Sequence, residues 1–299
     1  MPNVLPIPVS EEEPLATVLS TLRMKVLGTN IFEGTNLRQF PTRVYGGQVF
    51  AQAVVAAYAT LTGECDDREI HSINASFVRA GKMDCPTRLE VEEVLDGRSF
   101  STRRVVAQQN DRIIFSARAS FQELQGGVEH QSSMPDAPEP ESLPSSVDFF
   151  ANLHVPEAER MNRTNAVDMR HVGGAIWVRP QKNPSPHALI WFRLRSQMPQ
   201  ESPQSLHRAM LAYVTDQFML EPVMRAHGLF WLDKNLSVAT LDHSIWWHRD
   251  VDMSEWILAE LTSPSAQGGR GLSVARYYQN GTHIATMAQE GMVRIRSIQ

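Results

Sequence analysis

Hydrophobic and polar positions along this chain fall into two recurring patterns, one with the period of a helix and one with the period of a strand. Apolar residues run almost all round 48–61 and most of 206–227, which predicts two buried helices. Alternation of apolar and polar residues predicts β-strands after each helix. The predicted strands are 71–79, 87–95, 99–108, 112–122, 238–249, 255–262, 272–279 and 283–295.

Weaker patterns predict further elements before each buried helix. They are a short helix at 15–26, a strand or loop at 30–44, a helix at 148–162, and strands at 166–178 and 187–196.

The second half of the chain repeats the order of elements in the first. Each buried helix precedes a strand that contains His-Ser, an alternating strand, a Gly-Arg turn and a hairpin around Gln-Asn. Paired landmarks such as Gln109 and Gln279 are about 170 residues apart. The repeat predicts an α+β fold of two tandem units packed as a pseudo-dimer, each an antiparallel sheet wrapped around a central helix.

A change of composition separates the two units. Residues 125–146 are dense in Pro, Ser and acidic side chains, as expected of a linker. We therefore predict an N-terminal unit at 15–124, a linker at 125–150 and a C-terminal unit at 151–299.

Composition and charge narrow the function classes. Of 299 residues 42% are hydrophobic and 20% charged, and the net charge of −5 leaves no basic field for nucleic acid. Cys65 and Cys85 lack the spacing of metal ligands, so no metal site is expected. No apolar run reaches the roughly 20 residues that would span a bilayer. The N-terminus lacks a signal-peptide pattern and the C-terminus, Arg-Ser-Ile-Gln, is not a Ser-Lys-Leu address, so a cytoplasmic location is expected.

Three polar side chains stand out against apolar neighbours in the second half only. They are Asp216 within the second buried helix, Thr240 and Gln289 in strands. An acid, a hydroxyl and an amide can hold one water against one carbonyl carbon, with the acid as general base. The alternative is a solvent-facing acid on the helix and two ordinary strand residues. Because the first half lacks this set, one site per chain is expected.

Five collinear segments resemble a known family. They are VYGGQVFAQAVVAA (44–57), DGRSFSTRRV (96–105), LAYVTDQFML (211–220), ATLDHSIWWHR (239–249) and MAQEGMVR (287–294). Together they resemble the type II, TesB-like acyl-CoA thioesterases. The resemblance implies a double hotdog fold and hydrolysis of fatty acyl-CoA to free fatty acid and coenzyme A. It also implies that Asp216, Thr240 and Gln289 are the catalytic residues and that no cofactor is needed.

The chemistry implied by the resemblance needs an oxyanion site and a phosphate site. Backbone N–H groups of Gly46, Gly47 and Gln48 at a helix N-terminus are candidates for the oxyanion, although the glycines could simply permit a tight turn. Six arginines are candidates for the phosphates of coenzyme A, with scattered surface charge as the alternative. We select Arg79, Arg249 and Arg270 among them.

Other readings of the chain stay open at this point. His71 and His243 occupy equivalent positions in the two repeats, and one of these repeats lacks the acid, hydroxyl and amide. This favours a structural role for each histidine. A hotdog-type acyl-CoA hydratase and an acyl-CoA-binding module without turnover are the rival functions. Hotdog units bury sheet edges by pairing, so a homo-oligomer, either a dimer or a tetramer, is expected.

Overall fold

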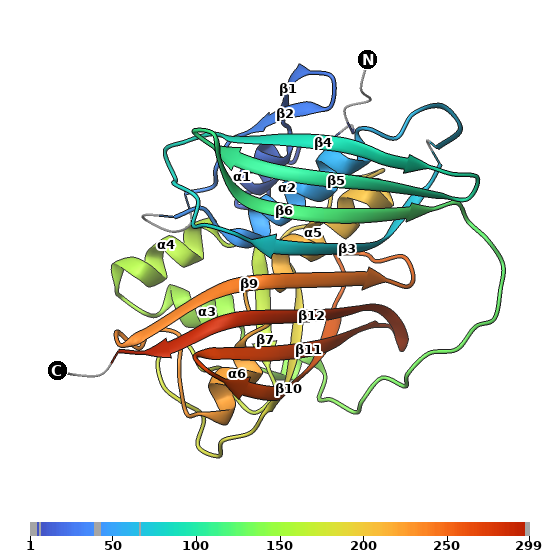
Figure 1. Ribbon diagram of the computed structural model, residues 1–299. Coiled ribbons are helices and arrows are strands. Elements are labelled where there is room, and N and C mark those ends of the chain that lie inside the picture. Colours follow the sequence, from blue (N-terminus) through green and yellow to red (C-terminus); the bar gives the residue numbers. More distant parts are fainter. Residues whose placement is uncertain (1–4, 6, 39–42, 66, 297–299) are drawn as a thin grey trace.

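The computed structural model describes residues 5, 7–38, 43–65 and 67–296 (Figure 1). These residues form one antiparallel sheet of twelve strands together with six α-helices. The strands are β1 (Lys25–Gly28), β2 (Ile31–Gly34), β3 (Glu69–Phe77), β4 (Thr87–Asp96), β5 (Phe100–Gln109), β6 (Arg112–Gln122), β7 (Val167–His171), β8 (His187–Leu194), β9 (Leu236–Trp247), β10 (Ile257–Gln267), β11 (Arg270–Gln279) and β12 (Thr282–Ile295). The helices are α1 (Leu15–Leu22), α2 (Gly46–Tyr58), α3 (Ser146–Ala151), α4 (Pro156–Thr164), α5 (Gln204–Thr215) and α6 (Glu221–Ala226).

The strand order divides the sheet into two halves that follow the repeat. The order is β1-β2-β4-β5-β6-β3-β9-β12-β11-β10-β8-β7, so each half of the chain supplies six neighbouring strands. β3 pairs with β9, with Ser72 opposite Trp246 and Ser76 opposite Asp242, and this pairing joins the halves. In Figure 1 the first half, blue to green, lies above the orange and red strands of the second.

One helix lies against the inner side of each half-sheet. Every residue of α2 after Gly46 is buried, and so is every residue of α5 after Gln204. The two helices pack against each other, and one hydrophobic core runs through both halves. Tyr45 ties the start of α2 to the end of α5, because its hydroxyl donates to the Tyr213 carbonyl at 2.6 Å.

Equivalent side chains make the same contacts in the two halves. The Gln109 side chain accepts from the Lys82 N–H at 2.7 Å, and the Gln279 side chain accepts from the Asp252 N–H at 2.9 Å. Arg79 Nη1 donates to the Ile113 carbonyl at 2.7 Å, and Arg249 Nη1 donates to the His283 carbonyl at 2.8 Å. The repeat predicted from the sequence therefore extends to individual hydrogen bonds.

The predicted helix at 206–227 is wrong in one important respect, because it is two helices. α5 ends at Thr215 and α6 begins at Glu221, with a turn between them. Pro222 explains the break, since it has no N–H for the carbonyl four residues earlier and its ring clashes with that carbonyl. Asp216 is consequently the C-cap of α5 and lies in the turn.

Several other boundaries differ from the predictions. The helix predicted at 148–162 is two helices, because Pro156 starts α4. The strand predicted at 166–178 ends at His171, before Gly173 and Gly174, both of which have positive φ. α3 begins within the predicted linker, where Ser145 and Ser146 bond to Asp168 of β7. The last three residues of the chain, 297–299, on which the targeting expectation depends, lie outside the described residues.

Candidate active site

Asp216 is buried at the boundary between the two halves. Its side chain is only 5% exposed, and its carboxylate lies at the N-terminus of α2 from the other half. The Gly47 backbone faces this carboxylate and lowers the pKa of Asp216. A helix N-terminus carries a partial positive charge, so this position stabilises the ionised carboxylate.

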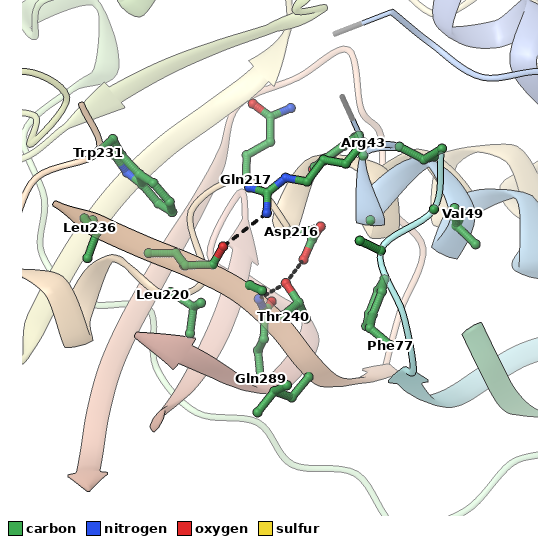
Figure 2. Close-up of a pocket in the computed structure, with 18 of the residues that line it drawn as sticks. Arg43, Val49, Phe77, Asp216, Gln217, Leu220, Trp231, Leu236, Thr240 and Gln289 are labelled. Carbon is green, nitrogen blue, oxygen red and sulfur yellow. Dashed lines mark hydrogen bonds between the residues drawn. The ribbon is translucent and has the colours of Figure 1, made fainter. Parts of the chain in front are cut away.

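Asp216, Thr240 and Gln289 are brought together in one hydrogen-bonded chain (Figure 2). Gln289 Nε2 donates to Thr240 Oγ1 at 2.9 Å, and Thr240 Oγ1 donates to Asp216 Oδ1 at 2.9 Å. β9 positions the threonine and the adjacent β12 positions the glutamine. The three residues therefore lie next to one another although they are far apart in the sequence.

Within the described part of the chain, the side-chain oxygen of Gln289 has no partner, in contrast to its nitrogen. Gln289 is 1% exposed, and its Oε1 is buried with no hydrogen-bond partner among the described residues. Buried polar atoms are almost always hydrogen-bonded in folded proteins. An acceptor left open beside a buried carboxylate suits a water molecule, which donates two hydrogen bonds.

Two opposing effects set the proton affinity of Asp216. Burial raises the pKa of Asp216, and hydrogen bonds from Thr240 and the Gly47 N–H partly oppose that rise. A carboxyl group with a raised pKa is a stronger base than an ordinary aspartate while it can still ionise near neutral pH. This balance fits a group that takes a proton from water.

Gly46 and Gly47 allow the close approach of the two halves. A Cβ atom at Gly46 would lie 2.7 Å from Asp216 Oδ2 and 2.9 Å from Phe77 Cε1. A Cβ atom at Gly47 would clash with the Tyr213 carbonyl oxygen. The glycines are thus required because Asp216 and Tyr213 of the second half pack against them. This reason differs from both the oxyanion interpretation and the tight-turn interpretation of the sequence.

Gln48 and Gly47 have defined partners. The Gln48 side chain accepts from the Leu37 N–H at 2.6 Å and donates to the Thr35 carbonyl at 2.8 Å, so it fixes the preceding loop. The Gly47 backbone faces the Asp216 carboxylate and lowers its pKa, so its N–H is directed to the acid. The N–H groups of Gly46 and Gln48, in the first turn of α2 where no intrahelical partner exists, are the remaining oxyanion candidates.

A cavity of about 620 Å³ adjoins these groups, a size typical of ligand pockets. Asp216, Thr240 and Gln289 all line it, and apolar side chains from both halves make up most of its wall. In Figure 2 Val49 and Phe77 lie on one side of Asp216, and Leu220, Trp231 and Leu236 on the other.

The predicted arginines do not share one location. Arg79 lines the cavity and is exposed, whereas Arg249 is not among the lining residues. Arg270 lies at a small separate pocket and pairs with Glu290 at 3.2 Å. Sequence reasoning missed Arg43, which lines the cavity near Asp216. Arg43 lies three residues before the Gly46-Gly47 pair, and this position could have indicated that it lies near the site.

His71 and His243 point to opposite sides of the sheet. A bulge in β3 at His71 turns that ring outward, where it bonds Ser120 Oγ at 2.8 Å. His243 is fully buried with Nδ1 4.0 Å from Asp216 Oδ1. Burial lowers the pKa of His243 to about 3, so the ring is neutral and the two residues do not form an ion pair. A structural role for both remains a prediction.

Groups of metal ligands and membrane-spanning helices are both absent from the described residues. No three His, Cys, Asp or Glu side chains in this part of the chain cluster in a way that could hold a metal ion. No helix within the described ranges is both long and apolar enough to cross a membrane.

The fold and the site together define the chain as a double hotdog protein with the Asp216, Thr240 and Gln289 cluster at the boundary between its units. A hot dog fold protein of unknown function from Alicyclobacillus acidocaldarius has the same arrangement, with a TM-score of 0.74 over 93% of this chain and 98% of that one at 17% identity. The predicted fold class is confirmed.

The chain belongs to the acyl-CoA thioesterase family. A profile described as acyl-CoA thioesterase N-terminal domain matches residues 38–122, and one described as acyl-CoA thioesterase matches 179–292. Acyl-coenzyme A thioesterase 8 of Homo sapiens is 33% identical over an alignment of 296 positions that covers 93% of this chain and 89% of that protein. The crystal structure of acyl-CoA thioesterase II TesB2 from Mycobacterium marinum is 34% identical with a TM-score of 0.76, covering 94% of this chain and 99% of that one.

Family membership makes the chain a hydrolase of acyl-CoA thioesters. The predicted family and activity are confirmed, and the hydratase and binding-module alternatives lose their support. The roles of individual residues are a separate question.

Proposed function

We propose that the chain hydrolyses fatty acyl-CoA with a water molecule held and deprotonated by Asp216. The observation that carries this proposal is the chain of hydrogen bonds from Gln289 through Thr240 to Asp216, which ends at a buried carboxylate beside an apolar cavity. The open Gln289 Oε1 gives the water a second acceptor.

We assign each group one step in the reaction. The water donates one hydrogen bond to Asp216 and one to Gln289 Oε1, which aims its lone pair at the thioester carbon. As the C–O bond forms, Asp216 takes the proton from the water. Collapse of the tetrahedral intermediate breaks the C–S bond, and the thiolate of coenzyme A leaves and takes the proton back from Asp216.

Thr240 orients the other two side chains in this mechanism and does not itself react. Its hydroxyl donates to Asp216 and accepts from Gln289, so both of its bonds serve to orient the other two side chains. We assign the developing oxyanion to the N–H groups of Gly46 and Gln48 at the positive end of α2.

Thr240→Val should move the acid limb of the pH–rate profile to higher pH. The hydrogen bond from Thr240 lowers the pKa of Asp216, so its loss raises that pKa further. Activity requires the ionised carboxylate, so a higher pKa protonates the base at a pH where the wild type still works. The profile of kcat/KM from pH 4 to 9, with Thr240→Ser as control, measures the shift. An unmoved limb in a folded Val variant contradicts the role of this bond.

Arg79 and Arg249 form a matched pair for locating coenzyme A. Each donates Nη1 to a main-chain carbonyl at the same place in its repeat, but only Arg79 lines the cavity. Arg79→Gln should raise KM for acyl-CoA by up to about fivefold, the scale of an exposed ion pair, and Arg249→Gln should not. An acyl-pantetheine substrate, which lacks the nucleotide phosphates, should show no change in either variant. Equal effects of the two variants would count against a phosphate contact at Arg79.

We propose further that the chain assembles as a homo-oligomer, a dimer or a tetramer, and works in the cytoplasm. β1 lies at one end of the sheet with Val26 and Leu27 exposed, so an edge is open for pairing. Cys65 and Cys85 are free thiols, as expected in a reducing compartment. Light scattering after gel filtration and fractionation of cells test the two proposals.

Release of free thiol across a series of acyl-CoA chain lengths is the direct test of the proposed function. Saturable thiol release from medium- or long-chain substrates is the expected result. Hydration of an enoyl-CoA without thiol release would instead indicate the hydratase alternative.

A further inference from the structure

The cavity extends from Asp216 in two directions that differ in chemistry (Figure 2). We infer that the acyl chain of the substrate lies on the side of the second half, in a space that we call the acyl arm, and that Trp231 sets its length. The inference rests on the proposed hydrolysis of fatty acyl-CoA. The acyl arm is lined by Met161, Met169, Trp177, Leu220, Trp231 and Leu236.

The charges around the cavity favour this orientation. On the side of the first half, Arg79 is an exposed lining residue, which suits the anionic phosphates of coenzyme A. Arg43 is also exposed and lines the cavity, but its Nη1 reaches across to β9 and donates to the Val238 carbonyl at 3.4 Å. The acyl arm itself is aliphatic and aromatic, and three charged residues of the cavity wall lie beside it. Glu157 is exposed, Arg160 is half-buried on α4, and Glu221 is fully paired. An alkyl chain gains free energy from such a wall because it leaves water for apolar surface.

A buried ionic cluster holds the wall around Trp231. Glu221 is 1% exposed and accepts from Trp231 Nε1 at 3.1 Å and from Arg225 Nη2 at 3.0 Å, and its Oε1 lies 3.0 Å from His171 Nε2. Burial would raise the pKa of Glu221, but His171 and Arg225 lower it to about 2. The carboxylate therefore stays ionised, and its bonds to Trp231 and Arg225 persist across the working pH range.

The same cluster fixes two loops that meet at the wall. Arg225 Nη2 donates to the Gly174 carbonyl at 2.9 Å, which ties the loop after β7 to α6. The Trp231 N–H donates to the Ile176 carbonyl and the Leu232 N–H to the Trp177 carbonyl, both at 2.9 Å. The loop after β7 and the loop after α6 are thus bonded to each other. Each is also bonded to the Glu221–Arg225 ion pair.

A buried ion pair is a costly way to build an apolar wall, since apolar residues of similar size would often be as stable. The ion pair does, however, fix the orientation of the indole, because Trp231 Nε1 donates its hydrogen bond to a carboxylate that cannot move. A wall that cannot move rejects an acyl chain that is too long by a methylene or two. Trp231 is therefore a specificity-determining residue, and Glu221 positions it.

The test is the dependence of kcat/KM on acyl chain length for wild type and three variants. Trp231→Ala and Leu236→Ala enlarge the acyl arm, and Val49→Ala enlarges the opposite side of the cavity by a change close in size to Leu236→Ala. We expect the first two to raise kcat/KM for chains longer than the wild-type optimum, relative to that optimum, by about tenfold per added methylene. Val49→Ala should leave this ratio unchanged.

Two outcomes overturn the inference. One is an unchanged ratio in a folded Trp231 variant, and the other is a shifted ratio in Val49→Ala. Thermal melting identifies variants that do not fold, and if Trp231→Ala fails to fold, the smaller change Trp231→Phe takes its place. A wild-type protein that releases no thiol from any chain length would be a failure of the proposed function instead, so the two failures are distinguishable.

Discussion

Asp216→Asn is expected to lower kcat by about 10²- to 10⁴-fold while the protein stays folded. The amide has the size of the carboxylate and can still accept from the Thr240 hydroxyl, but it cannot take a proton from water. Stability should be equal or higher, because a buried charge is replaced by a neutral group. Thiol release from acyl-CoA and a thermal melt measure the two effects.

Asp242→Asn is the matched control for this prediction. Asp242 is an exposed carboxylate on β9, the strand that carries Thr240, and it bonds Ser76 across the boundary between the halves. Its variant should retain near wild-type kcat. Turnover close to wild type in Asp216→Asn on several acyl-CoA lengths would remove Asp216 from the mechanism.

Gly46→Ala should lower kcat by about 10²-fold, the scale for displacing a reacting group by about 1 Å. The added methyl group would lie 2.7 Å from Asp216 Oδ2, so the carboxylate or α2 must shift. Helix propensity acts in the opposite direction, because alanine favours a helix more than glycine does. A loss of activity would therefore come from the clash and not from a weaker helix.

Gly126→Ala is the control for the glycine prediction. An added Cβ at Gly126, in the segment between the two units, meets nothing within 4 Å. This variant should have wild-type kcat and KM. If Gly46→Ala also keeps wild-type kcat, the position of Asp216 in the structure is not the one that the reaction uses.

The asymmetry between the repeats explains why a chain with two similar units has one such site. Asp216 follows α5, Thr240 and Gln289 lie on β9 and β12, and all three belong to the second half. The first half contributes the N-terminus of α2 and Phe77, which complete the surroundings of the carboxylate. Neither unit would form the site alone.

The sequence by itself determined the repeat and the strands, and it singled out the acid, hydroxyl and amide that the structure brings together. These features are local, because alternation fixes which strand residues face the core, and a lone polar residue in an apolar run is visible without coordinates. The predicted strands at 112–122 and 87–95 accordingly match β6 and β4 closely.

Only the tertiary structure decided how distant residues meet. A bulge in β3 sends His71 outward while His243 lies inside, and equal spacing in the sequence cannot reveal a shift of one residue in register. Arg79 and Arg249 are equivalent in the repeat, yet only Arg79 lines the cavity. Gly46 and Gly47 are required by Asp216 and Tyr213, more than 160 residues away along the chain. Such contacts form only when the two units pack together. The local pattern of hydrophobic and polar residues does not predict which surfaces of the units will be in contact.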